Sequence, residues 1–129
     1  MINSPYQKYQ QAQLQTASPG QLLLMLYDGA IRFIRAGIKG IEEMNHEKAN
    51  TNLCKAQAVI NELIAALNHD FPISSTLYQV YEYMLYQLIN ANLKKNVVPA
   101  EEVISHLIEL RGAWETAIKS LNHNVESIE

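Results

Sequence analysis

The stretch from Ser18 to Ile41 constrains this chain more than any other. Ser18 is a favoured N-cap, because its hydroxyl can accept a hydrogen bond from a free amide of the first helical turn. Pro19 suits the first helical position, where its missing N–H costs nothing. Gln21 stands three residues after Ser18, at the spacing of a capping box. The sequence therefore predicts a long first helix that runs from about Ser18 to Met44.

This first helix carries more apolar surface than one face of a bundle requires. On a helical wheel its charged side chains share one narrow arc, and apolar side chains fill most of the rest. A surface helix needs an apolar stripe of about 100°, and this one offers roughly twice that width. Either it is the most buried helix of the fold, or a partner or movable segment covers the excess. Gly29, Gly37 and Gly40 fall on one side of the wheel, which predicts a close approach by another element there.

Three further helices follow. We expect the second from about Glu47 to Leu67, the third from a cap at Ser74 or Ser75 to about Leu93, and the fourth from Pro99 to about residue 121. Four such helices joined by short loops predict an all-α, antiparallel up-down four-helix bundle. We divide the chain into a short N-terminal cap segment (1–17), the bundle (18–122) and a frayed C-terminal tail (123–129).

Two features add apolar surface to that of the first helix. Beside its main stripe, the third helix carries a second one made of Tyr78, Leu85 and Ile89. The Gln-rich leader carries Tyr6 and Tyr9, which would share one face of a short helix. The leader is either a frayed tail or a segment that docks on the body of the bundle.

The composition excludes several classes of protein. Hydrophobic residues make up 48% and charged residues 18% of the chain, which excludes disorder for most of its length. The net charge of -3 and the scattered lysines and arginines argue against nucleic acid as a partner. No apolar run is long enough for membrane insertion, and the first residues do not resemble a signal peptide. The single cysteine, Cys54, fits a reducing compartment and is expected to be a buried, inert thiol. We therefore expect a cytoplasmic protein.

Signs of catalysis are few. Glu43 and His46 have the Glu-x-x-His spacing of di-metal bundles, but the second such pair and the inward carboxylates are missing. His106 is the one histidine in the middle of a helix, and a phosphotransfer bundle would use such a residue. Its helical neighbours Glu102 and Glu109 would repel a phosphoryl group. A histidine phosphotransfer or metal-binding domain remains the alternative, and a plain structural bundle a third. The pattern favours a binding module that is not an enzyme and needs no cofactor.

Four motifs resemble one family. They are residues 16–30 (TASPGQLLLMLYDGA), 81–84 (YEYM), 88–92 (LINAN) and the stretch from EEV at 101–103 to LRGAW at 110–114. In this order, and with the leader tyrosines, they resemble the FliS family of flagellar secretion chaperones over essentially the whole chain. One departure is that members often carry Arg-Arg where this chain has Tyr86-Gln87.

The resemblance implies a four-helix bundle whose N-terminal cap moves aside for a client. The client is the disordered C-terminal segment of flagellin, which the chaperone binds in the cytoplasm, keeps from polymerising early and delivers to the gate of the flagellar type III export apparatus. Tyr6 and Tyr9 are then expected to shield a flagellin-binding groove in the free protein. The expected groove residues come from the first and third helices: Leu23, Tyr27, Ala30, Ile31, Ile34, Ile38, Tyr78, Leu85 and Ile89.

Overall fold

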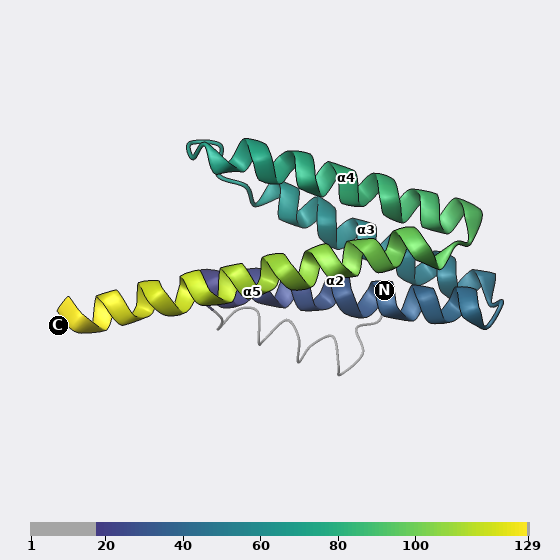
Figure 1. Ribbon diagram of the computed structural model, residues 1–129, viewed down its shortest axis with the longest axis horizontal. Helices are drawn as coiled ribbons and strands as arrows, with labels where there is room; N and C mark the ends of the chain where they lie inside the picture. Colours follow the sequence, from purple (N-terminus) through teal and green to yellow (C-terminus); the bar gives the residue numbers. More distant parts are fainter. Residues whose placement is uncertain (1–17, 129) are drawn as a thin grey trace, which may run out of the picture.

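The computed structural model describes the backbone of residues 18–128 and the side chains as far as residue 122. The described chain forms four helices and no strand: α2 (Pro19–Glu42), α3 (His46–Ala65), α4 (Ile73–Lys94) and α5 (Val97–Ile128) (Figure 1). Successive helices run antiparallel. Both α2 and α4 pack against α3 and α5, so α2 and α4 are diagonal across the core. The predicted all-α four-helix bundle is confirmed, while the expected cap segment, residues 1–17, lies outside the described residues.

The start of α2 follows the predicted capping box. The amide of Gln21 donates to the Ser18 hydroxyl over 3.2 Å, and the Ser18 amide donates back to the Gln21 side chain over 3.1 Å. These bonds satisfy amides that the helix itself leaves free. At the other end, Met44 takes a positive φ of 55°, and Asn45 caps α3 by accepting from the amide of Lys48.

Two of the three glycines that the wheel places on one side of α2 permit the close helix contact that it predicts. A Cβ on Gly40 would lie 2.6 Å from the backbone nitrogen of Ala49, and one on Gly37 would lie 2.7 Å from the Leu53 side chain. The α2–α3 contact therefore requires glycine at both positions. Gly29 is also buried, but an added Cβ there would meet no atom of the described chain within 4 Å, so the expected approach at Gly29 stays a prediction.

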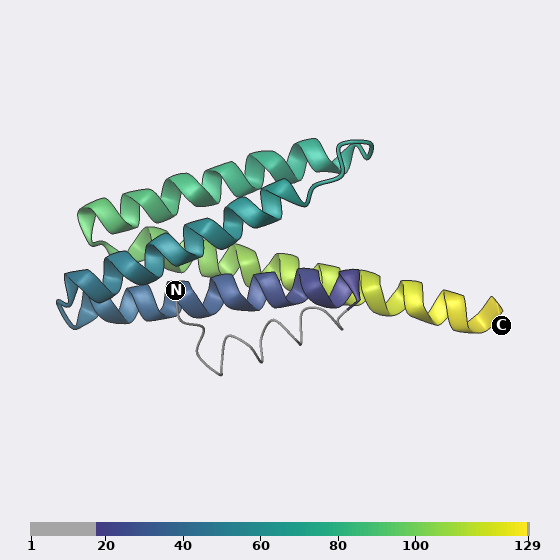
Figure 2. The same ribbon diagram turned by 180° about the vertical axis from the view of Figure 1, so that it is seen from behind.

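The later helix ends differ from the sequence-based expectations. No serine side chain caps α4, which begins at Ile73; the Ser74 hydroxyl instead donates to the carbonyl oxygen of Phe71 over 2.8 Å. The last helix begins before Pro99, since Asn96 accepts from the amide of Val98. The backbone of α5 is helical to Ile128, past the expected end near residue 121, and the fraying of residues 123–129 stays a prediction. No proline interrupts the sequence after position 99, and the last turns of α5 project past the start of α2 (Figures 1 and 2).

All four helices contribute to one core. Its largest fully buried side chains are Tyr27, Ile34, Leu53, Ile60, Leu63, Tyr81, Met84, Leu88, Val103 and Leu107. Cys54 is exposed, which corrects the expectation of a buried thiol. It lies on the same face of α3 as Asn50, whose side-chain oxygen accepts from Asn92 of α4 over 2.8 Å, and this face carries polar contacts at the surface.

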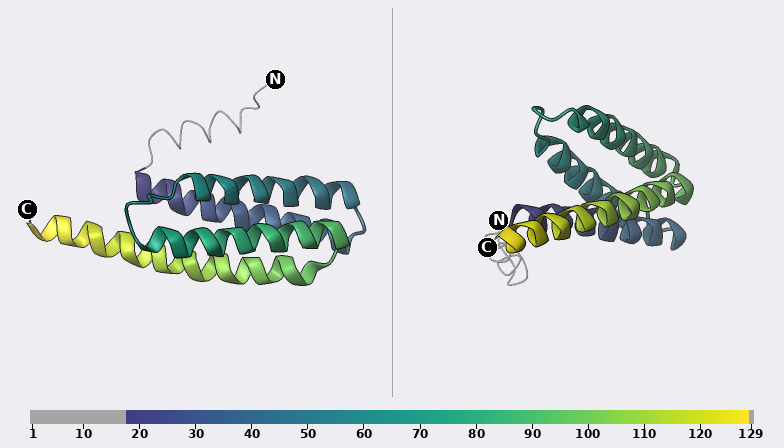
Figure 3. Two further views of the ribbon diagram at one scale, coloured as in Figure 1. Left: turned by 90° about the horizontal axis from the view of Figure 1, so that it is seen from above. Right: turned by 60° about the vertical axis from the view of Figure 1, so that its left-hand side comes forward.

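The four helices do not stay equally close along their length. The pair α3–α4 diverges from the pair α2–α5 toward the end that carries the loop between α3 and α4 (Figures 2 and 3). At the opposite end the short α2–α3 and α4–α5 connections hold the helices together. This divergence opens the bundle at one end, where the structure has an apolar pocket.

Candidate functional site

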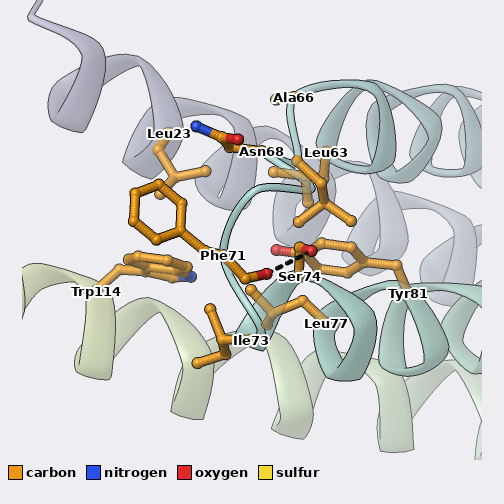
Figure 4. A pocket seen from close by; sticks show the side chains of 11 residues that line it. Leu23, Leu63, Ala66, Asn68, Phe71, Ile73, Ser74, Leu77, Tyr81 and Trp114 are labelled. Atoms are coloured by element: carbon orange, nitrogen blue, oxygen red, sulfur yellow. Dashed lines mark hydrogen bonds between the residues drawn. The ribbon is translucent and has the colours of Figure 1, made fainter.

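An apolar pocket of about 390 Å³ lies at the open end of the bundle (Figure 4). Side chains of all four helices and of the α3–α4 loop point into it. The lining residues are Leu23, Leu63, Ala66, Leu67, Asn68, Phe71, Ile73, Ser74, Leu77, Tyr81 and Trp114. A concave, mostly apolar surface with few polar groups is typical of a binding site.

The α3–α4 loop forms the rim of this pocket. Pro72 follows Phe71, and the residue before a proline is disfavoured in the helical region, so α3 cannot continue directly into α4. The turn leaves the side chains of Phe71 and Ile73 each 60% exposed. Large apolar side chains exposed beside an apolar pocket favour a partner that covers both.

Three polar side chains bridge diagonal and adjacent helices beneath the pocket. The hydroxyls of Tyr27 (α2) and Tyr81 (α4) are 2.5 Å apart and share a hydrogen bond. The indole nitrogen of Trp114 (α5) donates to the Tyr27 hydroxyl over 3.0 Å. Burial raises the pKa of both tyrosine hydroxyls above the ordinary value of 10.0. Both tyrosines therefore stay neutral at physiological pH, and the polar groups under the pocket bind one another.

A second apolar surface follows α4. Tyr78 is 39% exposed and Ile89 is 44% exposed, with the partly buried Leu85 between them. Leu93 continues this side of the helix. Asn92, which shares the side, bonds Asn50 of α3, so the stripe borders the α3–α4 contact. We call Tyr78, Leu85, Ile89 and Leu93 the α4 stripe.

The structure divides the predicted groove residues into two groups. Tyr27, Ala30, Ile31 and Ile34 belong to the core, and none of them is more than 7% exposed. Their assignment to the groove stays a prediction, but in this conformation almost none of their surface is accessible. The physical reason is that α2 is covered on both flanks by α3 and α5.

The remaining predicted positions keep accessible surface. Leu23 lines the pocket, Ile38 is half-buried against the core, and the three α4 residues form the α4 stripe. The structure thus brings Leu23 to the pocket but leaves Ile38 at a distance along α2, nearer the α2–α3 turn. Tyr6 and Tyr9 lie outside the described residues.

Sequence reasoning missed most of the pocket. None of Phe71, Ile73 and Trp114 was among the predicted groove residues, and Trp114 entered the sequence analysis only through the LRGAW motif at 110–114. One signal was available: two large apolar residues flank a proline in a loop, where polar residues are usual. Such residues either pack back onto the core or stay exposed until a partner covers them.

The two residues that depart from the family pattern have different surroundings. Tyr86 is 66% exposed. Gln87 donates to Glu102 of α5 over 2.6 Å, and Tyr83 donates to the other oxygen of the same carboxylate over 2.7 Å. These hydrogen bonds lower the pKa of Glu102, and the bond from Tyr83 has the largest effect. Gln87 therefore joins α4 to α5 with a neutral side chain.

The histidine alternatives find little support in the geometry. His106 lies 3.4 Å from the Glu102 carboxylate and edge-on to Tyr83, so a phosphoryl group on its ring nitrogen would meet a negative charge. His46 is exposed at the start of α3. In the described part of the chain, no three histidine, cysteine or acidic side chains gather as a metal site would require. Nor is any described helix both long and apolar enough to cross a membrane.

Comparison with known proteins gives consistent matches. The family model described as flagellar protein FliS matches residues 1–121. The flagellar secretion chaperone FliS of Bacillus subtilis is 41% identical over 119 residues, which cover 92% of this chain and 90% of that protein. The protein of the same name from Vibrio cholerae is 30% identical over 92% of this chain and 88% of its own length. That of Escherichia coli is 29% identical over 81% and 79%.

Proposed function

Because the chain belongs to the FliS family of flagellar secretion chaperones, we propose that it binds the C-terminal segment of flagellin in the cytoplasm. In this proposal the bound segment cannot assemble early, and the complex is delivered to the gate of the flagellar type III export apparatus. The observation that carries the proposal is the pocket at the open end of the bundle together with the α4 stripe.

The client is a segment that orders as it binds, so the surface must compensate for that ordering. Ordering a disordered segment costs about 2–5 kcal/mol or more of the gross interaction energy. Covering a half-exposed large apolar side chain contributes about 1 kcal/mol. Phe71, Ile73, Ile89 and Leu93, each 44–80% exposed, together contribute an amount similar to the ordering cost. A stable complex therefore requires the client to fill the pocket as well as cover the α4 stripe.

The leader has a regulatory part in this proposal. Tyr6 and Tyr9 cover apolar surface in the free chaperone and leave it when the client arrives. The flank of α2 offers such surface, since Leu22 and Met25 are half-buried yet do not pack against the core cluster of the described residues. Removing residues 1–17 is then expected to increase the affinity for the client and to reduce solubility.

Calorimetry with a flagellin C-terminal peptide tests the client site. Ile89→Asp on the α4 stripe and Ile73→Asp at the pocket rim are each expected to weaken binding about tenfold or more, since a buried carboxylate would face apolar groups. Val98→Asp is the matched control, because Val98 is 64% exposed and lies in neither surface. Wild-type affinity in both folded test variants would exclude these surfaces.

A polymerisation assay tests the chaperone activity itself. Flagellin that polymerises alone is expected to stay monomeric with one equivalent of this protein, and to polymerise again with Ile73→Asp. Delivery is tested in cells, where loss of the protein is expected to leave flagellin inside the cell. Polymerisation at an unchanged rate in the presence of the wild-type protein would contradict the proposal.

A further inference from the structure

A second pocket, of about 460 Å³, opens between α2 and α5 and shares no residue with the apolar pocket. Its lining combines cations with an apolar floor. The residues are Asp28, Ile31, Arg32 and Arg35 of α2 and Ile108 and Arg111 of α5. The client proposal does not use this surface, so its function must be sought separately.

Two acidic side chains near this pocket form ion pairs with Arg111. Arg111 donates through Nε and Nη2 to the two carboxylate oxygens of Asp28, over 2.5 and 3.2 Å, and through Nη1 to Glu115 over 2.7 Å. Glu115 also accepts from Lys119. Asp28 and Glu115 therefore neutralise Arg111 and fix the direction of its guanidinium.

The two other arginines of this pocket have no carboxylate partner in the described part of the chain. Arg32 and Arg35 are exposed and form no ion pair with any carboxylate in the described part of the chain. They lie three residues apart, on one side of α2. In a chain with a net charge of -3, this pair is a local positive surface beside the pocket. A guanidinium binds a carboxylate through two parallel hydrogen bonds, which gives directional recognition.

The floor of the pocket indicates what accompanies the negative charge. Ile31 is 7% exposed, and Ile108 beside it is 48% exposed. A free inorganic anion would gain nothing from Ile108, whereas an apolar side chain would. Since the pocket lies in the seam between two antiparallel helices, a third helix can rest along it.

We propose that this pocket binds an acidic amphipathic helix of a partner protein. The helix places an apolar side chain on Ile108 and two carboxylates, one turn apart, on Arg32 and Arg35. The inference is independent of the client site. It assigns the chaperone a second interaction surface on the α2–α5 seam.

The probe is a designed 18-residue helical peptide with glutamates one turn apart beside a leucine, compared with the same peptide carrying glutamines. We expect the glutamate peptide to shift the amide NMR signals of Arg32, Arg35 and Ile108. Its affinity should fall as salt rises from 50 to 300 mM, because ion pairs at a surface are screened. The glutamine peptide should bind about tenfold more weakly.

Paired charge reversals provide the decisive comparison. R32E/R35E should weaken binding of the glutamate peptide about tenfold or more. K55E/K94E makes the same change of net charge at exposed lysines outside the pocket and should leave the affinity unchanged. Circular dichroism verifies that both variants fold.

Three results would overturn the proposal. The first is equal affinity for the glutamate and glutamine peptides, and the second is wild-type affinity in folded R32E/R35E. The third is a short single-stranded DNA that binds the same residues as tightly as the peptide, which would make the surface a phosphate site.

Discussion

The hydrogen bonds beneath the pocket permit a quantitative test of stability. The Tyr27 hydroxyl bonds two side chains, Tyr81 and Trp114, whereas the Tyr81 hydroxyl bonds only Tyr27 in the described part of the chain. Tyr27→Phe removes the group that bonds both Tyr81 and Trp114. The Tyr81 hydroxyl, on a side chain that is 1% exposed, then loses the hydrogen bond that joins it to α2. Leaving a buried polar group unpaired costs about 1–3 kcal/mol. With the indole N–H also unpaired, we expect Tyr27→Phe to lower the free energy of unfolding by about 2–4 kcal/mol.

Tyr81→Phe is the matched control. It also removes one hydroxyl from the core, but the Tyr27 hydroxyl still accepts from Trp114. The expected loss is about 1 kcal/mol, the net value of one ordinary hydrogen bond. The double variant Tyr27→Phe/Tyr81→Phe removes both hydroxyls and leaves only the indole N–H without its partner. Its cost should therefore be smaller than the sum of the single costs by about 1 kcal/mol or more.

Urea unfolding measures all four proteins. Circular dichroism follows the helices, and Trp114, the only tryptophan in the chain, reports the site itself by fluorescence. The midpoint should shift while the dependence on urea stays constant. The reasoning is refuted if Tyr27→Phe costs no more than Tyr81→Phe, or if the two single costs add.

Three further predictions concern stability. Burial holds the pKa of Tyr27 above 10.0 in the folded protein, so as the pH rises the Tyr27 hydroxyl is deprotonated first in the unfolded state. The free energy of unfolding should therefore fall above pH 10 by about 1.4 kcal/mol per pH unit. Urea unfolding at alkaline pH should show a shallower fall for Tyr27→Phe than for the wild-type protein. Gly40→Ala should destabilise the fold by about 1–3 kcal/mol, because the added Cβ would meet the backbone of Ala49. Gly112→Ala should stabilise the fold by up to about 1 kcal/mol, because the added Cβ would meet no atom of the described chain within 4 Å. Equal melting temperatures for the two variants would contradict both expectations. Ser18→Ala should cost about 1 kcal/mol through loss of the cap, and an unchanged midpoint would show that the box contributes nothing.

Local signals were enough to predict the number, order and approximate bounds of the helices. The capping box at Ser18 and Gln21 is complete within four residues, so no tertiary information is needed to place the start of α2. The end of α5 is different, because nothing in the sequence after Pro99 forces a stop. Composition suggested an end near residue 121, whereas the backbone is helical to Ile128.

Groove and core could not be separated in the same way. A helical wheel gives the direction of each side chain but not the neighbour that it meets. Ile34 and Ile38 lie close together on the wheel of α2, yet Ile34 is fully buried and Ile38 keeps accessible surface. The pocket itself depends on the divergence of two helix pairs, which is a property of the packed bundle and not of any one helix.

The tyrosines show why polar tips are ambiguous in a sequence. An aromatic ring with a hydroxyl suits an interface because the tip can stay in water, and both Tyr27 and Tyr78 were expected in the groove. Tyr27 instead meets Tyr81, 54 positions later in the chain, and each satisfies the other inside the protein. Tyr78 has no such partner on a diagonal helix and stays 39% exposed. Only the pairing of α2 with α4 across the core distinguishes the two, so burial of a tyrosine depends on whether its hydroxyl finds a second polar tip at the same depth.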